Sequence, residues 1–484
     1  MDFRPIRNKI GSFSFDSLTR QLLAILRNQE TGAAYTAFWH PLILLKWTLE
    51  FSEQKYPHKI ATRADVIKLL RQLEDLEMSH EIFDLKRNGR TSKTFTILAC
   101  QQFMYQEQGW RDSFARQLIL FKKLKHKYDI ASSFEEKSGL DIEDFLKMLY
   151  IIWLCIFHTD IIKISYYGYI SPEVLGIIET TFGKKKLEML LSLFSISREN
   201  LKEVLLYDKR GIKNYNLQSF ESSIFTRKPF FLFDRKYFVP HKDVLNHTIN
   251  YFIYEFMKSK DDSFTTELGM RMEKYMKLGL DEIGVKYLTE NDLKKTIGLN
   301  NNLVDFVIDK NVLVEAKAIE MKPYVSVNPE DDILANEFRK NLVKAYSDQM
   351  LNVAEKLNNN QEYFGIIVTY RKLFLGDSSD IWAQFLKDET IKLRNEESLK
   401  ILPIENLFFI DLYTWDLLIQ LLKRKTVSLI DILKKAREND SDPKTKKFSF
   451  SMHLAEYNIG NFDCKYLEDA YEEVSNCLEE SGND

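Results

Sequence analysis

The sequence predicts an α/β protein in which a large, mostly α-helical N-terminal part precedes a mixed α/β part. Apolar residues recur at helical spacing through residues 1 to about 250. In the C-terminal half, short β-branched runs at 303–308 and 312–318 are bounded by turn-forming residues, which is typical of strands. Glycine (17) and proline (10) are scarce for a chain of 484 residues, and this favours packed helices over a loop-rich fold.

The composition is that of a globular protein with a substantial core, with 45% hydrophobic and 29% charged residues. The net charge of −3 means that contact with nucleic acid would need local basic patches. The most apolar run, 148–157, is too short to cross a bilayer and predicts a buried helix. The N-terminus has no signal-peptide pattern, and the four cysteines lack the spacing of metal or disulfide sites. We therefore expect a cytoplasmic protein without membrane contact.

Capping signals mark several helices of the N-terminal part. Thr62 and Asp65 have the spacing of a capping box, and Ser171 with Pro172 opens a helix that Gly183 ends. We expect residues 1–257 to form a helical recognition or regulatory domain. Basic clusters stand at 122–127, at Lys184, Lys185 and Lys186, and at 209–213. Lys184 to Lys186 are candidate nucleic-acid contacts, and the alternative is that these clusters are solvated helix faces.

The C-terminal part reads as one helix followed by alternating strands and helices. An apolar ladder (Phe264, Leu268, Met272, Met276, Leu280) predicts the helix 263–280. The further predicted elements are a strand at 285–288, a hairpin at 303–318 turning at 309–311, a long helix at 329–357, strands at 363–370 and 407–412, and helices at 415–422 and 429–435. Residues 439–484 are expected to be a polar, acidic and mobile C-terminal tail.

Three ionisable residues stand inside the predicted hairpin, where an unpaired charge is costly. They are Asp305, Glu315 and Lys317. Side chains alternate along a strand, so Glu315 and Lys317 share one face, and Asp305 is able to point at the same spot from the other arm. Two carboxylates and a lysine around one point suit a Mg²⁺ ion and a water molecule. The alternative is a cross-strand ion pair on a solvated face.

The stretch 304–318, V-D-F-V-I-D-K-N-V-L-V-E-A-K-A, resembles the core of the PD-(D/E)XK nuclease superfamily. The proline of the family name is absent, because Val304 precedes Asp305. The resemblance implies a restriction-endonuclease-like α-β-β-β-α-β core within a nuclease domain at 258–438. It also implies catalytic roles for Asp305, Glu315 and Lys317, with Mg²⁺ as cofactor and Mn²⁺ able to substitute.

Further site residues follow from the same resemblance. Asp305, Glu315 and the backbone carbonyl of Ala316 would ligate the metal, and Lys317 would orient or deprotonate the attacking water. The family often adds an acid from the first helix, for which Glu273 is favoured over Glu267, because Glu267 falls beside Arg271 and reads as surface. Gln349 interrupts the apolar stripe of the second long helix, and is either a residue supporting the site or a glutamine satisfied by backbone groups.

The sequence thus predicts a metal-dependent (endo)nuclease that hydrolyses phosphodiester bonds, with DNA favoured over RNA as the partner. The resemblance implies a role in bacterial restriction or anti-phage defence. The alternative is a non-catalytic nucleic-acid-binding or scaffold protein on a nuclease-like core. The sequence leaves open a homo-oligomer or a partner protein, and endonuclease or exonuclease action.

Overall fold

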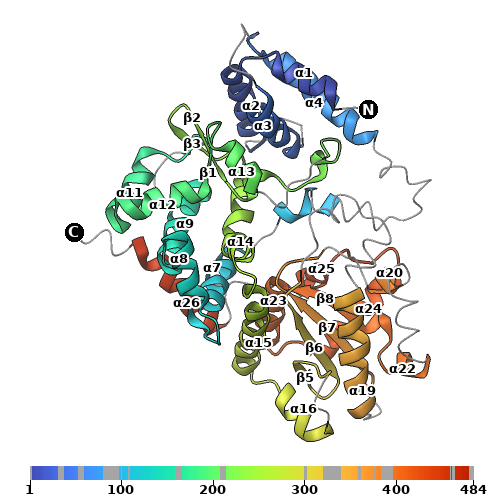
Figure 1. The fold of residues 1–484 in the computed structure, drawn as a ribbon. Helices are drawn as coiled ribbons and strands as arrows, with labels where there is room; N and C mark the ends of the chain where they lie inside the picture. The colour runs from blue at the N-terminus through green and yellow to red at the C-terminus, as the bar shows by residue number, and fades with distance from the viewer. Residues whose placement is uncertain are drawn as a thin grey trace.

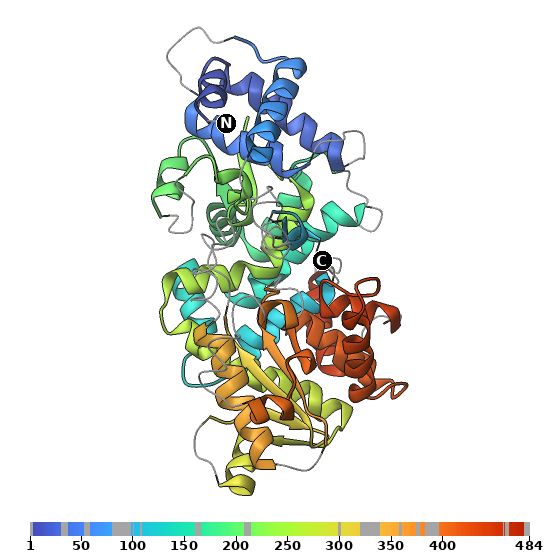
Figure 2. The ribbon, with the colours of Figure 1, turned by 90° about the vertical axis from the view of Figure 1, so that its right-hand side faces the viewer.

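The computed structural model describes residues 3–30, 37–52, 59–79, 98–99, 101–106, 109–159, 166–207, 214–298, 302–319, 339–357, 361–373, 378–382, 396–457, 459 and 464–478. Within these ranges the chain is mostly helical and contains two small mixed sheets. The N-terminal helices lie at one end of the molecule and the larger sheet at the other (Figures 1 and 2). None of the described helices has the length and apolarity needed to cross a membrane.

The N-terminal end is a bundle of amphipathic helices with its own apolar core, which includes Phe3 and Trp47. Thr62 and Asp65 form the predicted capping box at the start of the fourth helix. The bundle consists of α1 (Arg4–Gly11), α2 (Phe15–Glu30), α3 (Trp39–Phe51) and α4 (Arg63–Met78).

The middle of the molecule surrounds helix α9 (Ile142–Phe157), whose apolar run is buried as predicted. Ser171 caps the helix that begins at Pro172, also as predicted. The other helical segments here are η2 (Phe103–Tyr105), α7 (Trp110–Leu118), η3 (Ile119–Lys123), α8 (Ile130–Ser138), α11 (Pro172–Phe182), α12 (Lys184–Phe194), α13 (Leu201–Tyr207), η4 (Gln218–Phe220), η5 (Ile224–Thr226) and α14 (Lys242–Lys260).

A three-stranded sheet lies beside these helices. It contains β1 (Ser195–Ile196), β2 (Phe230–Phe233) and β3 (Lys236–Phe238). β1 runs parallel to β2, and β2 and β3 form a hairpin. Asp234 and Arg235 form its turn with positive φ angles of 50° and 59°.

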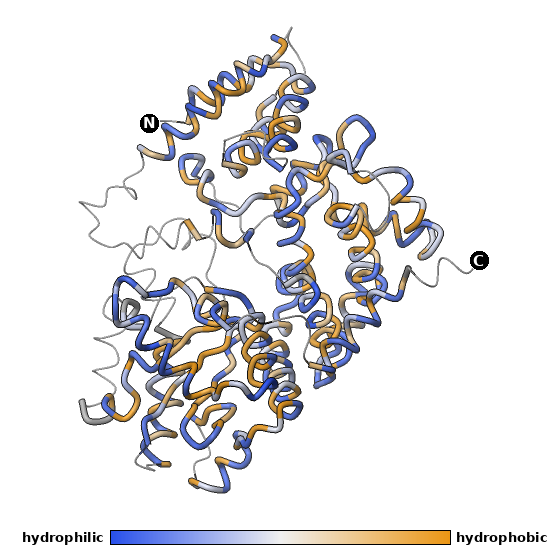
Figure 3. The backbone as a smooth tube through the Cα atoms, turned by 180° about the vertical axis from the view of Figure 1, so that it is seen from behind, coloured by the Kyte–Doolittle hydropathy of each residue, from blue (hydrophilic) through white to orange (hydrophobic). Residues whose placement is uncertain are grey.

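The larger sheet has five strands in the order β4-β5-β6-β7-β8. The first three pair antiparallel, and β7 and β8 continue the sheet in parallel. The β5–β6 turn lies at Asp309 and Lys310, as predicted, with φ of 48° and 75°. The strands are β4 (Tyr287–Thr289), β5 (Phe306–Ile308), β6 (Val312–Lys317), β7 (Phe364–Thr369) and β8 (Leu407–Asp411). β5, β7 and β8 consist mostly of hydrophobic residues, and Figure 3 shows hydrophobic segments in this part of the molecule.

Helices cover both faces of this sheet. α15 (Phe264–Ile283) and α23 (Leu412–Lys423) pack on one face, and the π-helical segment η6 (Arg339–Met350) with α19 (Leu351–Leu357) packs on the other. The predicted helix 329–357 is observed over 339–357, and its first part lies outside the described residues. The sequence reasoning did not predict α16 (Glu290–Ile297), which stands between β4 and β5. Shorter segments near β7 and β8 are α20 (Ser378–Ile381), α22 (Glu396–Ile401) and η8 (Ile404–Asn406).

The expectation of a polar, mobile tail over 439–484 is wrong for most of the described C-terminal residues. α24 (Leu429–Ser441) is followed by α25 (Phe450–Leu454), η9 (Ala455–Tyr457), α26 (Lys465–Ser475) and η10 (Asn476–Leu478). Helix α26 packs against α7 and α9, with Leu467, Ala470 and Val474 buried. The acids of this helix occupy its outer face, so the high charge reflects an amphipathic helix. One apolar core therefore runs continuously from α7 through α15 to α26.

Candidate active site

Strand β6 places the three predicted side chains by alternation. Val312 and Val314 face the core beneath α15, and Leu313 faces the core beneath η6 and α19. Glu315 and Lys317 follow Leu313 at intervals of two, so they lie on the η6 face, as predicted. Asp305 directly precedes β5, because that strand begins at Phe306.

Asp305 and Glu315 are joined through the backbone. The Asp305 N–H donates to Glu315 Oε2 at 3.2 Å, and Asp305 Oδ2 accepts from the Ala316 N–H at 2.7 Å. The Asp305 carbonyl accepts from the Glu290 N–H at 3.1 Å, which ties the first turn of α16 to the same point. Asp305 Oδ1 accepts no hydrogen bond from a described residue. The two acids thus converge, and one carboxylate oxygen is left available.

Lys317 and Gln349 complete a closed network around Glu315. Lys317 Nζ lies 2.5 Å from Glu315 Oε1 and 2.8 Å from Gln349 Oε1. Gln349 Nε2 donates to Glu315 Oε1 at 2.6 Å and to the Leu303 carbonyl at 2.8 Å. Gln349 therefore has both of the roles considered for it. Its amide supports the site through Lys317 and Glu315, and it also bonds the backbone carbonyl of Leu303.

The site concentrates negative charge in a poorly solvated place. Burial raises the pKa of Asp305 well above its ordinary value, and the charges of Glu315 and Glu273 raise it further. Burial also raises the pKa of Glu315, against the opposing effects of Lys317 and Gln349. Glu315 is only 3% exposed. The cluster therefore favours either protons or a cation beside the acids.

The two helix acids occupy different environments. Glu273 is half-buried and forms no hydrogen bond or ion pair with a described residue; burial and then Glu290 raise its pKa. Its charge acts on Asp305, which places it near the cluster. Glu267 points elsewhere: it accepts from Arg271 Nε at 2.9 Å and lies 2.9 Å from His126 Nδ1.

The predicted Glu267–Arg271 pair is present, but the expectation that Glu267 is a surface residue is wrong. Glu267 is 5% exposed and Arg271 is 1% exposed. Arg271 also donates to the Leu120 and Tyr128 carbonyls, so the pair joins α15 to the end of the α7–η3 segment. The sequence did not indicate the burial of this pair, because its further partners, His126 and Tyr128, lie about 140 residues away along the chain.

Two further residues, Gly269 and Glu290, lie close to the predicted site. A side-chain Cβ at Gly269 would lie 4.0 Å from the Ala318 Cβ, which is an ordinary contact, so the approach of strand and helix does not require glycine there. Glu290, whose charge acts on Glu273, was missed. The capping box formed by Thr289 and Asp292 is visible in the sequence and could have indicated the helix that carries it.

Whether the cluster can hold a metal ion depends on which of its oxygen atoms already accept hydrogen bonds. No group of three His, Cys, Asp or Glu side chains in the described part of the chain is arranged to hold a metal ion. Both oxygens of Glu315 already accept hydrogen bonds, whereas Asp305 Oδ1 and the Glu273 carboxylate have no such partner among the described residues. The N–H and C=O of a strand residue point to the same side, so the Ala316 carbonyl faces the side of Asp305.

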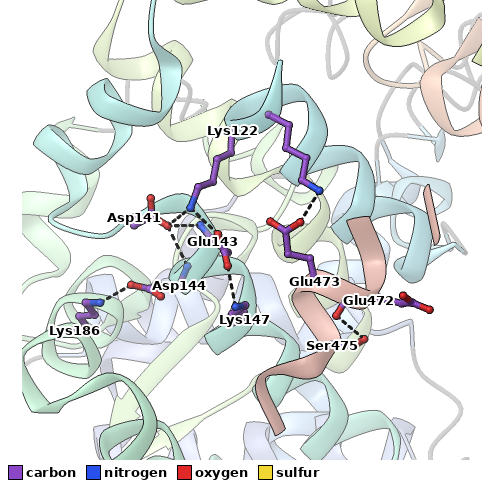
Figure 4. Close-up of polar contacts among 10 residues, drawn as sticks. Lys122, Asp141, Glu143, Asp144, Lys147, Lys186, Glu472, Glu473 and Ser475 are labelled. Atoms are coloured by element: carbon purple, nitrogen blue, oxygen red, sulfur yellow. Dashed lines mark hydrogen bonds and ion pairs between the residues drawn. The ribbon is translucent and has the colours of Figure 1, made fainter. Parts of the chain in front are cut away.

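Several lysines of the basic clusters in the N-terminal part pair with acids (Figure 4). Lys186 pairs with Asp144, and Lys184 lies 3.9 Å from Glu188. Lys185 is exposed and has no partner among the described residues. Lys122 pairs with Asp141 and Glu143, and Lys123 pairs with Glu473 of α26. The cluster 209–213 lies outside the described residues.

The comparisons with known proteins add no relative: no protein-family model, curated protein or solved structure matches the chain.

Proposed function

We propose that this protein is a metal-dependent nuclease that hydrolyses phosphodiester bonds at the Asp305–Glu315–Lys317 cluster, with DNA as the favoured substrate. The observation that carries the proposal is the convergence of two acids and a lysine where β5 begins and β6 ends, opposite the hairpin turn. Gln349 holds Glu315 and Lys317 there. The element order also supports it. With α16 inserted between β4 and β5, the elements α15, β4 to β6, η6–α19 and β7 are in the α-β-β-β-α-β order that the resemblance implies.

A divalent cation fits the charge of the cluster. Glu273, Asp305 and Glu315 have raised pKa values, although Lys317 lowers those of Asp305 and Glu315, and Lys274 lowers that of Glu273. Asp305, Glu273, the Ala316 carbonyl and Glu315 would hold Mg²⁺ or Mn²⁺, since these ions prefer carboxylate and carbonyl oxygens. The bound ion would supply Lewis-acid stabilisation of the phosphate and its leaving oxygen.

The chain's own residues have distinct tasks in this proposal. Lys317 is the positioning group or base for the attacking water, because its ammonium group lies between Glu315 and Gln349 with 20% of the side chain exposed. Gln349 fixes Lys317 and Glu315 relative to each other. Asp305 is held in position by the Ala316 N–H, and its Oδ1 accepts no hydrogen bond from the part of the chain that the structure describes. The helical half would position the nucleic acid, and a role in bacterial restriction or anti-phage defence rests on the resemblance alone.

One observation favours the second candidate, a non-catalytic nucleic-acid-binding or scaffold protein. Glu315 is fully hydrogen-bonded by Lys317, Gln349 and the Asp305 N–H, so the network is also a complete structural unit. In that case the same residues would stabilise the end of the β5–β6 hairpin that lies opposite its turn, and replacing Lys317 would lower the stability without changing any activity.

The experiment is incubation of the full chain with plasmid, linear duplex, single-stranded DNA and RNA, in Mg²⁺, in Mn²⁺ and in EDTA. The proposal predicts cleavage of at least one DNA substrate with either ion and none in EDTA. Asp305→Asn and Glu315→Gln remove charge with little change of shape, and both should abolish cleavage. Lys68→Ala, which removes an exposed lysine of α4, is the matched control, because α4 lies at the end of the molecule opposite the larger sheet (Figure 1). Cleavage that survives in both acid variants would assign the activity to another site or to a contaminant.

A further inference from the structure

A second candidate site lies at the other end of the molecule, in the helical part. A cleft of about 350 Å³ opens between α2, the segment 166–170 and the β2–β3 hairpin. This volume is within the range of pockets that bind small organic groups. Its lining includes Arg20, Arg27, Tyr167, Phe233 and Phe238. The cleft is therefore aromatic and cationic, and it shares no residue with the acid cluster.

Tyr167 is unusual among the aromatic residues of this chain. It is 65% exposed, and it is the one exposed aromatic side chain among those that the structure describes. The chain carries 34 phenylalanines and 23 tyrosines, so the fold covers its aromatic rings almost everywhere else that is described. The Tyr167 ring stacks on Tyr169 with a centroid separation of 6.2 Å and an interplanar angle of 28°. An exposed ring supported by a second ring is a preformed stacking platform.

The backbone holds this platform rigidly against the hairpin. The Val239 N–H donates to the Gly168 carbonyl at 2.9 Å, and the Ile170 N–H donates to the Tyr237 carbonyl at 2.9 Å. Gly168 has a φ of +85°, which turns the chain directly after Tyr167. The segment thus extends the small sheet, and Tyr167 is presented at a turn supported by hydrogen bonds.

Cations surround the platform, although the chain as a whole is negative. Lys236 Nζ lies 4.4 Å from the Tyr169 ring centroid, and the Arg20 guanidinium lies 5.2 Å from the Phe233 ring centroid. Arg235 is exposed and forms no ion pair with a described residue. Two acids oppose these charges: Asp234 pairs with Arg20 at 3.1 Å, and Glu30 pairs with Arg27 at 2.9 Å.

Arg27 shapes the cleft, whereas the other cations are available to a ligand. Arg27 is committed to Glu30 and to the Tyr166 carbonyl, and its guanidinium lies over the Tyr166 ring at 4.7 Å. Arg20 is 60% exposed in its side chain, and its partner Asp234 is equally open to water, so this ion pair is weak. A phosphate could therefore compete for Arg20.

We infer that this cleft binds a nucleotide unit, with the base stacked on Tyr167 and the phosphate held by Arg20 and Lys236. Unpaired bases stack on aromatic side chains irrespective of sequence, and arginine binds phosphate strongly. The bases of a duplex are already stacked on each other, so an unpaired strand or end, or a free nucleotide, is the ligand. The inference deepens the proposed function by naming a strand-binding site, but the binding itself does not depend on cleavage.

The test is fluorescence anisotropy in EDTA with a labelled single-stranded oligodeoxynucleotide, the matching duplex and, as competitor, a nucleoside monophosphate. Tyr167→Ala should weaken strand binding about tenfold, since it removes one base-stacking contact. Tyr167→Phe retains the ring and should bind as the wild type does. Lys236→Ala should reduce the slope of log affinity against log salt concentration by about one, which corresponds to one lost phosphate contact. Lys425→Ala removes an exposed lysine just after α23, away from the cleft, and should change neither quantity.

The outcomes separate the sources of the ligand and the two proposals. Tight strand binding with weak competition by the monophosphate assigns the cleft to nucleic acid, and equal binding of both assigns it to a free nucleotide. The inference is overturned if Tyr167→Ala binds as the wild type does, or if neither ligand binds. The binding is measured in EDTA, which prevents metal-dependent cleavage, so the two proposals are tested separately. If binding depends on Tyr167 but the protein cleaves no nucleic acid with Mg²⁺ or Mn²⁺, the nuclease proposal fails and the binding-site inference stands.

Discussion

Replacing Gln349 with methionine tests the network that positions Lys317 and Glu315. Methionine has nearly the same length and volume but neither donates nor accepts strong hydrogen bonds. The change removes the bond from Lys317 Nζ (2.8 Å) and the bonds to Glu315 Oε1 (2.6 Å) and the Leu303 carbonyl (2.8 Å). Two of these three bonds involve a charged group.

The magnitude follows from the kind of bond lost. A hydrogen bond to a charged group contributes about 1.5–3 kcal/mol and a neutral one about 1 kcal/mol. Gln349 is half-buried, so water replaces part of what is lost. We expect the free energy of unfolding of Gln349→Met to fall by about 2 kcal/mol. Asn352→Ala is the matched control, because it lies one turn further along and donates one exposed bond to the Asn302 carbonyl. It should change stability by less than about 0.5 kcal/mol.

The pH dependence has a defined sign. The Gln349 bond lowers the pKa of Glu315, although burial keeps that pKa above its ordinary value. The bond therefore favours the ionised carboxylate. Its contribution is present at pH values above the Glu315 pKa and is lost as the pH falls through it. The difference between wild type and Gln349→Met should thus be largest near neutral pH and should shrink in acid.

Urea denaturation in EDTA across this pH range measures both quantities. Positioning of the site predicts in addition that the cleavage rate of Gln349→Met falls about 10- to 100-fold with Mg²⁺. Unchanged stability and unchanged cleavage together would show that Gln349 does not organise the site.

Three further predictions address the remaining assignments. Glu267→Gln should lower the free energy of unfolding by about 3 kcal/mol, because it leaves the buried Arg271 guanidinium without its counter-charge. Glu273→Gln should leave stability nearly unchanged and should reduce cleavage about tenfold or more. Urea denaturation and a cleavage assay measure both effects, and a large loss of cleavage in Glu267→Gln but not in Glu273→Gln would contradict this assignment. Reversing the charges of 184–186 should leave the salt dependence of nucleic-acid binding unchanged in anisotropy titrations, because two of these lysines already pair with acids, whereas a smaller slope would show phosphate contact. Leu467→Ala should cost about 2–4 kcal/mol in denaturation if α26 belongs to the core, and a change below about 0.5 kcal/mol would show that it does not.

The sequence predicted the larger sheet well because its signals are local. The β5–β6 turn, the apolar strand β7 and the shared face of Glu315 and Lys317 follow from turn chemistry and from a period of two residues. The capping box of Thr62 and Asp65 and the proline start of α11 are also local patterns, and these predictions are confirmed.

The errors concern contacts between distant segments. Glu267 looked exposed because its partner His126 lies 141 residues away, and α26 looked like a polar tail because its apolar stripe is short. Tyr167 carried no signal in a sequence rich in aromatics, since its significance depends on the burial of the others. Such features arise from tertiary packing, which a single sequence does not display.

The most direct measurement compares the single-turnover cleavage of labelled DNA in Mg²⁺ by the wild type and by Lys317→Met, purified identically. In the proposed site Lys317 positions or deprotonates the attacking water, and its neighbours Glu315 and Gln349 remain in the variant. The proposal predicts that Lys317→Met binds Mn²⁺ with unchanged stoichiometry in calorimetry and cleaves at least about 100-fold more slowly. Equal cleavage rates for the two proteins, or no cleavage by the wild type on any substrate, would contradict the assignment of this cluster as a nuclease site.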